Sequence, residues 1–553
     1  MQNTDFVKNY LRAFKQVKAF YPRFPLHFFF ISILFIFISL ISTYTPFFLR
    51  QATNEIGEKG SVFYLYALAY AGCWTIENIL QNVKGIFSAG VLARSDASLN
   101  KSFLNSIFSY SYLQERKLDV GSTAQDIDRA AAAFSALTIS FFWTIVPLFF
   151  EFFSILAILS SSLSFKFSIL FGGSTISLSL IAYYIASKSE NIHSSIFSAQ
   201  NNVQSYTIER LGALTDLRIN LAQDKELKVA NHHLSQMVQA IWSANLKMGI
   251  YLGAQALSIG IVLGVFTIYS AHLDTSNQLT SGDFAMIAGY VAILTVQLRF
   301  LSGALIDLKR NQVALTRGLA FFPDERPIPA RSDNHVPQKT DRLFFVNNVT
   351  LGLYGKVLLR NFSCSFRKGE LSVISAPSGR GKTTLIHAML GFLPCTEGHI
   401  EIYGIPIHLL QSKNVFEYVA FAPQAVSIFS SSLRFNLLYG VDRHVPDEEL
   451  LYLLKEFEFT SSSTQNFESI LDEAVGTGGR LLSGGERQRI SILRALLREK
   501  SVLILDEPTA SLNLNLGKKI IGFIASKVET IIVITHDTHI AEMADNLIEL
   551  PMQ

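Results

Sequence analysis

The chain has 553 residues, of which 49% are hydrophobic and only 16% are charged, and its mean hydropathy is +0.30. Soluble domains typically carry about 25% charged residues, so part of this chain is expected in lipid, and its length predicts two or more domains. The net charge of +3 is too small to indicate a nucleic-acid partner, and Cys73, Cys364 and Cys395 lack the spacing of a disulfide framework or a metal site.

The first 23 residues alternate apolar and basic side chains, with Lys8, Arg12 and Lys15 among the cations. This pattern is typical of a helix that lies in the membrane interface. The alternative is a polar tail. We expect an interfacial helix over residues 1–23.

Six apolar segments follow, each near the length of about 20 residues that a membrane-spanning helix needs. They span residues 24–49, 61–83, 134–160, 165–187, 245–271 and 283–305. The second is the weakest, because Glu77, Asn78 and Gln81 interrupt its C-terminal end. We therefore expect a six-helix transmembrane domain over residues 24–322.

The connections between these segments indicate the orientation of the chain. Residues 84–133 and 188–244 are long, polar and periodic in the manner of helices, so they are expected to continue membrane helices into water. Lys and Arg are concentrated there and in the N-terminal stretch. By the positive-inside rule, the N-terminus, both long connections and the C-terminal domain face the cytoplasm, which predicts a multi-pass protein of the bacterial inner membrane.

Residues 323–340 are rich in proline and charge and are predicted to form a linker, whereas residues 341–553 have the pattern of a soluble α/β domain. Two domains are therefore expected, one in the membrane and one in water.

The first motif of the soluble domain is SAPSGRGKTTLI, residues 375–386, which combines an apolar strand, a glycine-containing loop and a helical pattern. In that order, backbone N–H groups and a helix N-terminus converge on phosphate oxygens, with the lysine on the β- and γ-phosphates and Thr383 on Mg²⁺. Ala376 replaces the first glycine of the usual pattern, which is tolerable if the backbone there needs no positive φ. The predicted nucleotide-binding residues are Ser378, Gly379, Arg380, Gly381, Lys382, Thr383 and Thr384.

The second motif, SVLILDEPTASLN, places Asp506 and Glu507 directly after four apolar residues that predict a buried parallel strand. Beside a phosphate loop, the first acid can orient Mg²⁺ and its waters, and the second can polarise an attacking water.

Between them, LLSGGERQRISILRAL has Ser483, Gly484 and Gly485 at the start of a predicted helix, a further anion-compatible N-terminus. The stretch LSGGERQR resembles the signature motif of ATP-binding cassette (ABC) proteins. FAPQAVSIFSSSLRFNLL resembles the glutamine-loop segment with Gln424 in the glutamine position, and VITHD places His536 at the switch histidine.

The whole chain resembles an ABC exporter of the half-transporter type. The resemblance implies a multi-domain fold with an all-α, six-helix transmembrane domain and an α/β P-loop NTPase (ABC ATPase) domain. It implies ATP and Mg²⁺ as ligands, with Thr383, Gln424 and Asp506 around the metal and Glu507, His536 and Gln424 as catalytic residues. It also implies a dimer in which each ATP lies between the phosphate loop of one chain and the signature of the other, and coupling helices near 108–116 and 208–216.

Departures from the family pattern also fall in the cassette. Ala376 is expected to alter nucleotide affinity, and Asn513 replaces the usual aspartate in the loop after Glu507, which is expected to weaken communication between sites. Tyr354 is the candidate for the adenine-stacking aromatic, although it is shifted by about one residue. Because the chain has both a catalytic glutamate and a full signature, a homodimer is favoured.

The residues that recognise a substrate are expected among polar groups at membrane depth, which point inward by default because lipid exposure is costly. The alternative is that they pair with one another or cap helix breaks. The candidates are Glu77, Asn78, Glu151, Gln297 and Arg299.

The resemblance implies ATP-driven export, by alternating access, of a small amphipathic molecule or a mature peptide, since no N-terminal peptidase domain is expected. A lipid flippase and an exporter of glutathione-type conjugates share the architecture and remain alternatives. A cassette regulator that does not transport is disfavoured by the hydrolytic residues Glu507 and His536.

Overall fold

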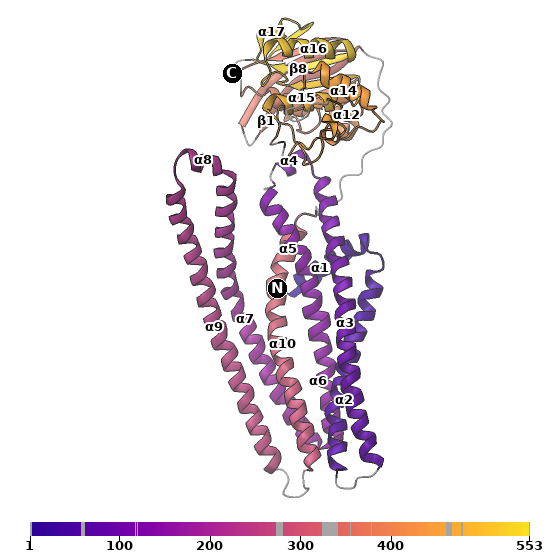
Figure 1. Ribbon diagram of the computed structural model, residues 1–553, viewed down its shortest axis with the longest axis vertical. Coiled ribbons are helices and arrows are strands. Elements are labelled where there is room, and N and C mark those ends of the chain that lie inside the picture. Colours follow the sequence, from indigo (N-terminus) through magenta and orange to yellow (C-terminus); the bar gives the residue numbers. More distant parts are fainter. Residues whose placement is uncertain are drawn as a thin grey trace. The chain divides into compact units, whose positions relative to one another are not determined.

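The computed structural model describes residues 3–56, 61–116, 118, 120–272, 280–322, 341–353, 356–377, 379–410, 412–459, 467–476, 479 and 481–551. The chain forms two compact units, one of Met1–Ser109 with Leu118–Asp324 and the other of Tyr110–Lys117 with Glu325–Gln553 (Figure 1). The predicted linker, residues 323–340, lies outside the described residues.

The described secondary structure of the first unit is entirely helical, and five of the predicted membrane segments each lie in one long helix. The helices are α1 (Asn3–Phe20), α2 (Phe24–Asn54), α3 (Ser61–Phe108), α5 (Val120–Thr138), η1 (Ile139–Ile145), α6 (Val146–Ser162), α7 (Phe165–Gly212), α8 (Leu214–Ile219), α9 (Gln223–His272) and α10 (Ser281–Leu319). The remaining predicted segment, 134–160, runs through α5, η1 and α6. As expected, α3, α7 and α9 continue far beyond their apolar segments.

Within the described residues, four helices are long and apolar enough to cross a membrane by length and composition alone: Phe24–Asn54, Thr123–Ser162, Phe165–Lys188 and Ser281–Leu319. The described part of α3 does not qualify, since Glu77, Asn78 and Gln81 interrupt its apolar run, and the described part of α9 does not qualify either.

The third membrane segment contains a π-helix, which the sequence analysis did not predict. Over Ile139–Ile145 the turns widen, and the Val146 N–H donates to the carbonyl of Phe141, five residues earlier. Pro147 follows directly; its ring lacks an N–H and crowds the preceding turn, so a wider turn accommodates it.

The helices of this unit pack around a core to which α1 contributes. Tyr10, Ala13 and Val17 repeat at helical spacing and are buried against α3, α5 and α10. At Gly318, a side chain would come within 2.1 Å of the Cβ of Ala130, so only glycine allows α10 to approach α5 this closely. One face of α1 is therefore packed in protein.

Helices α7 and α9 run side by side and are joined by the short helix α8, and α7 also packs against α6 and α10 (Figure 1). Near this turn, Glu226 accepts hydrogen bonds from Tyr206 and from Arg210, at 2.6 and 2.7 Å. The helix α8 begins at Leu214, within the range 208–216 expected for a coupling helix, and ends at Ile219, three residues beyond that range.

In its described part, the second unit is an α/β domain with two sheets. An antiparallel sheet has the order β2 (Lys356–Arg367), β1 (Arg342–Leu353), β4 (Glu397–Ile402), β5 (Ile405–Pro406). A parallel sheet has the order β6 (Val419–Ala422), β7 (Val502–Asp506), β8 (Thr530–Thr535), β3 (Leu371–Ser375), β9 (Asn546–Glu549). Strands β7 and β8 are buried along their whole length, as their unbroken apolar runs require.

The described helices of this unit are short compared with those of the first unit. They are α11 (Lys382–Met389), η2 (Ile407–Leu409), α12 (Ser412–Tyr418), α13 (Leu433–Leu437), α14 (Asp447–Glu456), η3 (Phe467–Asp472), α15 (Gly484–Leu496), α16 (Leu514–Lys527) and α17 (Thr538–Ala541). Helix α11 packs against β1 and β4 of the antiparallel sheet. The predicted fold class, a helical transmembrane domain with an α/β nucleotide-binding domain, is confirmed.

The four-residue helix α4 (Tyr112–Glu115) comes from the first long connection but belongs to the second unit. Ser111 and Gln114 close its first turn as a capping box. The Tyr112 ring stacks on Phe392 at 5.2 Å and lies 4.8 Å from His387. This segment lies within the range 108–116 expected for a coupling helix.

Candidate functional site

The carboxyl ends of adjacent parallel strands bring the predicted catalytic residues to one edge of the sheet. The phosphate loop follows β3, Asp506 ends β7 and Glu507 comes next, and His536 follows β8. Gln424 stands two residues after β6, which pairs with β7. Ligands of open α/β sheets bind at this edge.

The phosphate loop has the backbone that its glycines suggest. Gly379 and Gly381 have φ of +80° and +87°, a conformation that disfavours other residues, and Gly381 caps α11. Ala376 is not among the described residues with positive φ, so its methyl group is accommodated. Its carbonyl accepts a hydrogen bond from Lys382 Nζ at 2.5 Å. The lysine is thereby held at the mouth of the loop, 3.8 Å from Glu507.

Asp506 and Thr383 form a pair suited to a divalent cation. Thr383 Oγ1 donates to Asp506 Oδ2 at 3.2 Å, while the other carboxylate oxygen, Oδ1, is buried without a hydrogen-bond partner. Burial raises the pKa of Asp506 to about 6, and the Thr383 hydrogen bond opposes the shift. A buried carboxylate oxygen without a partner next to a threonine hydroxyl fits Mg²⁺, which prefers such hard oxygen ligands.

The other two predicted catalytic side chains, those of Gln424 and His536, meet at Glu507. Gln424 Nε2 donates to Glu507 Oε2 at 2.6 Å, and His536 Nδ1 lies 3.8 Å from Glu507 Oε1. Glu507 has φ of +48°, a strained backbone for a residue with a side chain. Its N–H donates to the Ile534 carbonyl at 2.8 Å, which fixes the turn against β8.

Gln488 positions this turn and was not among the predicted site residues. Its Nε2 donates to the Glu507 carbonyl, and its Oε1 accepts from the Ser511 N–H at 3.0 Å. Gln488 therefore holds both ends of the loop after β7 in place. The sequence held a signal for this role: in LSGGERQR, Gln488 stands four residues after the start of the helix, and its amide side chain faces the core.

The signature residues lie at the exposed N-terminus of α15. Ser483 Oγ accepts from the Glu486 N–H at 3.2 Å, and Glu486 accepts in return from the Ser483 N–H at 2.7 Å. A side chain at Gly485 would come within 2.9 Å of the Ser511 carbonyl, so glycine lets α15 approach the loop after Glu507. Gly484 is exposed beside it.

The remaining predicted cassette residues fall into three groups. Arg380 is half-buried in the phosphate loop, and Thr384 is half-buried in the first turn of α11. Asn513 caps α16 by accepting from the Leu516 N–H at 2.8 Å, a bond that an aspartate would also accept. Tyr354 and Ser378 lie outside the described residues.

In the first unit, two of the five predicted substrate residues form one buried cluster. Glu151 on α6 is 3% exposed and accepts hydrogen bonds from Ser39 and Ser42 of α2 and from Gln297 of α10, at 3.2, 2.8 and 2.8 Å. Gln297 also lines an apolar cavity of about 330 Å³ between α6, α7 and α10.

The other three candidates lie outside this cluster of hydrogen bonds. Glu77 is half-buried on α3 and interacts electrostatically with Glu151. Asn78 donates to the Trp74 carbonyl of its own helix at 2.7 Å, and Arg299 is exposed.

Two sequence families match the chain. Residues 28–298 match the ABC transporter transmembrane region, and residues 359–510 match the ABC transporter family. Among solved structures, a bacterial Atm1-family ABC exporter with ATP bound has a TM-score of 0.81 over 94% of this chain and 92% of its own, at 19% identity. That likeness establishes the fold.

Curated relatives match about two thirds of the chain. An ATP-dependent lipid A-core flippase of Francisella tularensis subsp. holarctica is 26% identical over 381 residues, which are 67% of this chain and 62% of the relative. The probable multidrug resistance ABC transporter ATP-binding/permease protein YheI of Bacillus subtilis is 27% identical over 380 residues, 67% of this chain and 64% of the relative. The match thus spans less than two thirds of these relatives.

A nucleotide-binding cassette joined in one chain to a helical transmembrane region defines the class of this protein. The chain belongs to the ABC transporters, with one transmembrane region and one cassette in a single chain, and it has the fold of the Atm1-family exporter structure.

Proposed function

We propose that the chain hydrolyses ATP and uses the energy to export a substrate from the cytoplasm across the bacterial inner membrane. The observation that carries this proposal is the convergence of Lys382, Thr383, Asp506, Glu507 and His536 at one sheet edge. Lys382 and the loop amides bind the phosphates. Glu507 orients and polarises the attacking water, and His536 contacts the γ-phosphate.

Mg²⁺ would be held by Thr383 and Asp506, with Gln424 close by, and supplies charge neutralisation to the phosphates. Gln424 holds Glu507 by a hydrogen bond, so displacement of Gln424 by ligand would free that carboxylate to face water. In the proposed cycle, movement of Gln424 toward Mg²⁺ would thus couple ligand binding to the release of Glu507.

The active form is proposed to be a homodimer with two ATP sites, each completed by the partner's signature. The exposed N-terminus of α15, with Ser483 and Gly484, is available to such a partner. Helix N-termini favour anions, which suits the γ-phosphate of a nucleotide bound to the other chain.

The proposed substrate is a small amphipathic molecule or a mature peptide. The apolar cavity beside Gln297, backed by buried Glu151, offers one polar contact in an apolar wall. A lipid flippase is the second candidate, since several relatives bear that name and the cavity wall is apolar. Movement of a labelled lipid between leaflets of proteoliposomes, compared with uptake of labelled peptides, distinguishes the two.

The test of the proposed function is ATP hydrolysis by the purified chain in lipid nanodiscs. Glu507→Gln is expected to lower turnover by at least about a hundredfold, the size typical of losing a group that acts in the transition state. Glu529→Gln, an exposed carboxylate away from the site, is the matched control. Equal turnover in wild type and Glu507→Gln, or none in wild type, would refute the proposal for this chain alone.

A further inference from the structure

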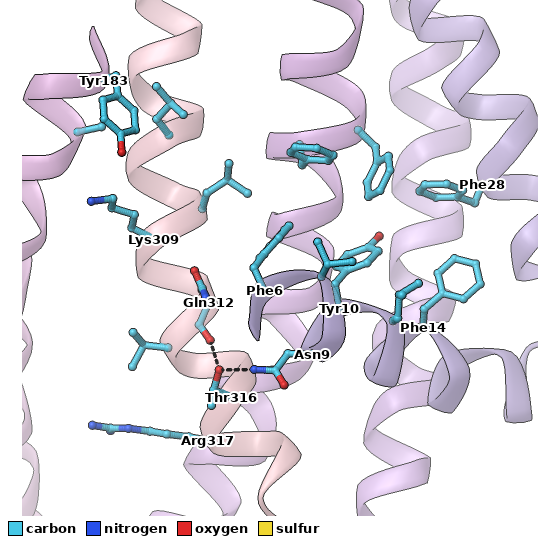
Figure 2. Close-up of a pocket in the computed structure, with 18 residues that line it drawn as sticks. Phe6, Asn9, Tyr10, Phe14, Phe28, Tyr183, Lys309, Gln312, Thr316 and Arg317 are labelled. Carbon is cyan, nitrogen blue, oxygen red and sulfur yellow. Dashed lines mark hydrogen bonds between the residues drawn. The ribbon is translucent and has the colours of Figure 1, made fainter. Parts of the chain in front are cut away.

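Hydrogen bonds between polar side chains hold separate elements together in both units. In the first unit they lie beside a cavity of about 1210 Å³ between α1, α2, η1, α7 and α10 (Figure 2). There, Asn9 Nδ2 donates to Thr316 Oγ1 at 3.0 Å, and Thr316 Oγ1 donates to the Gln312 carbonyl at 2.8 Å, which holds α1 on α10. A larger network lies in the cassette, around the segment of chain that carries Gln424.

Gln424 stands on an exposed stretch of chain with little backbone support. Strand β6 ends two residues earlier, at Ala422, and among the described residues the backbone of 424–428 forms no hydrogen bond with other backbone groups. Such a stretch has many accessible conformations unless side chains restrict it. The position of Gln424 relative to Glu507 therefore depends on what holds the two ends of the stretch.

The signature helix, α15, holds both ends. Ser491 Oγ donates to the Pro423 carbonyl, directly before Gln424, at 3.4 Å. Three residues further along α15, Arg494 Nη1 donates to the Ser427 carbonyl at 3.1 Å. Residues three apart are neighbours on a helix surface, so one side of α15 reaches both carbonyls. The stretch that carries Gln424 is thereby fixed at two points on one helix.

Asn436 extends the Arg494 anchor along the chain. The Asn436 side chain is fully buried, and it pairs with both backbone groups of Phe429: Oδ1 accepts from the N–H at 2.9 Å and Nδ2 donates to the carbonyl at 3.0 Å. Arg494 Nε donates to the Asn436 carbonyl at 2.8 Å, and Nη2 donates to Asn436 Oδ1 at 3.4 Å. The guanidinium therefore joins the Ser427 end of the stretch to a buried amide.

The bonds of Arg494 define the path of the chain rather than neutralise an acid. Among the described residues, Arg494 has no carboxylate partner, and its three nitrogens donate to carbonyl and amide oxygens. The Tyr439 ring covers the guanidinium, with its centroid 5.5 Å from Cζ. A planar guanidinium donates in fixed directions that a lysine ammonium does not reproduce, so this geometry requires arginine.

We propose that Arg494 is a positioning residue for Gln424. By holding the segment 427–436 on α15, it keeps Gln424 Nε2 at 2.6 Å from Glu507 Oε2 and within reach of the proposed Mg²⁺ site. The same helix carries Gln488, which bonds to the turn of Glu507, so α15 positions both members of this pair. The inference rests on the proposed function, because its consequence is a change in ATP turnover.

The test is a double-mutant cycle on ATP turnover by the full-length protein in lipid nanodiscs. Arg494→Lys keeps the charge but loses the fork, and it is expected to lower kcat about tenfold, as for small misplacements of a catalytic group. The dissociation constant of ATP should change less than about twofold, because the interaction lost is one made during turnover. Gln424→Ala is expected to lower kcat at least about tenfold as well.

The combination of the two variants decides whether Arg494 acts through Gln424. In the Gln424→Ala background, Arg494→Lys should lower kcat by less than a further factor of about two, because no side chain is left to position. If the two losses multiply instead, Arg494 acts elsewhere and the proposal is overturned. Absence of turnover in wild type would refute the proposed function and this inference with it, whereas failure of the inference alone leaves wild-type turnover intact.

A matched control separates positioning from a general weakening of the domain. Arg443→Lys changes another half-buried arginine of the cassette, whose partners are Glu449 and Glu499. It should leave kcat within about twofold of wild type, since its ion pairs lie near the surface. Hydrogen exchange of the Phe429 amide should accelerate at least about tenfold in Arg494→Lys but not in Arg443→Lys. Unchanged exchange in Arg494→Lys, or an equal loss of kcat in the control, would overturn the proposal.

Discussion

The protonation of Asp506 affects both the stability of the cassette and its capacity for Mg²⁺. Burial raises its pKa from 3.8 to about 6 in the folded protein. Because the folded value is the higher one, the folded protein binds this proton more tightly than the unfolded chain does. The resulting stabilisation is complete below about pH 4 and is lost as the pH rises through about 6.

Asp506→Asn is therefore expected to stabilise the cassette in the absence of nucleotide. The gain relative to wild type should rise from near zero at pH 4 to at most about 3 kcal/mol above pH 7. Thermal unfolding of the full chain between pH 4 and pH 8 measures this. With Mg²⁺ and ATP present, wild type should become more stable than Asp506→Asn, because the amide cannot replace the carboxylate as a ligand. A stabilisation by Asp506→Asn that does not change with pH would contradict the raised pKa of Asp506.

Gln488 is expected to act by positioning Glu507 rather than by touching the nucleotide. Gln488→Ala removes its bonds to the Glu507 carbonyl and the Ser511 N–H. We expect ATP turnover to fall about ten- to a hundredfold, as for small misplacements of a catalytic group. The dissociation constant of ATP, measured by equilibrium binding, should change less than about twofold, since Lys382 and the loop are untouched. Loss of ATP binding in proportion to turnover would indicate a collapsed cassette instead.

At the scale of elements, α4 belongs to the sequence of the membrane domain but packs within the cassette unit. A helix of four residues is too short to be stable alone, so its order depends on the contacts of Tyr112 with Phe392 and His387. Burial, and secondarily the charge of Arg116, lower the pKa of His387 beside this ring.

Tyr112→Ala is expected to release α4, whereas Tyr112→Phe keeps the ring and should preserve it. Hydrogen exchange of the amides in residues 111–116 should accelerate at least about tenfold in the alanine variant only, because local opening then costs less free energy. Equal protection in both variants would show that Tyr112 does not fasten the helix.

The elements that the sequence predicted best are those set by long periodic or apolar runs. The apolar runs of α2 and α10, and of strands β7 and β8, fall where expected, because each depends on local composition. The π-helix was missed, since it arises from Pro147 acting on a preceding helix. The Glu151 cluster was half predicted: a charge at membrane depth indicated a partner, but the serines of α2 become visible only when the helices pack.

At the scale of the whole molecule, the positions of the cassette motifs are consistent with an ATP site to which two chains contribute. The phosphate loop and the acids after β7 meet at one sheet edge, whereas the signature lies at the N-terminus of α15 with Ser483 and Gly484 exposed. If each ATP site takes its phosphate loop from one chain and its signature from the other, defects in different chains should complement.

Complementation tests this arrangement with Lys382→Ala and Ser483→Arg. A homodimer of either variant has one defect in each of its two sites, so both should lack turnover. In a mixed dimer, one site collects both defects and the other has none, so Mg²⁺-dependent hydrolysis should return, up to about half of wild type if the sites act independently. Two different affinity tags purify the mixed dimer for an ATPase assay in nanodiscs. If each site lies within one chain, the mixed dimer stays inactive, and the head-to-tail arrangement is wrong.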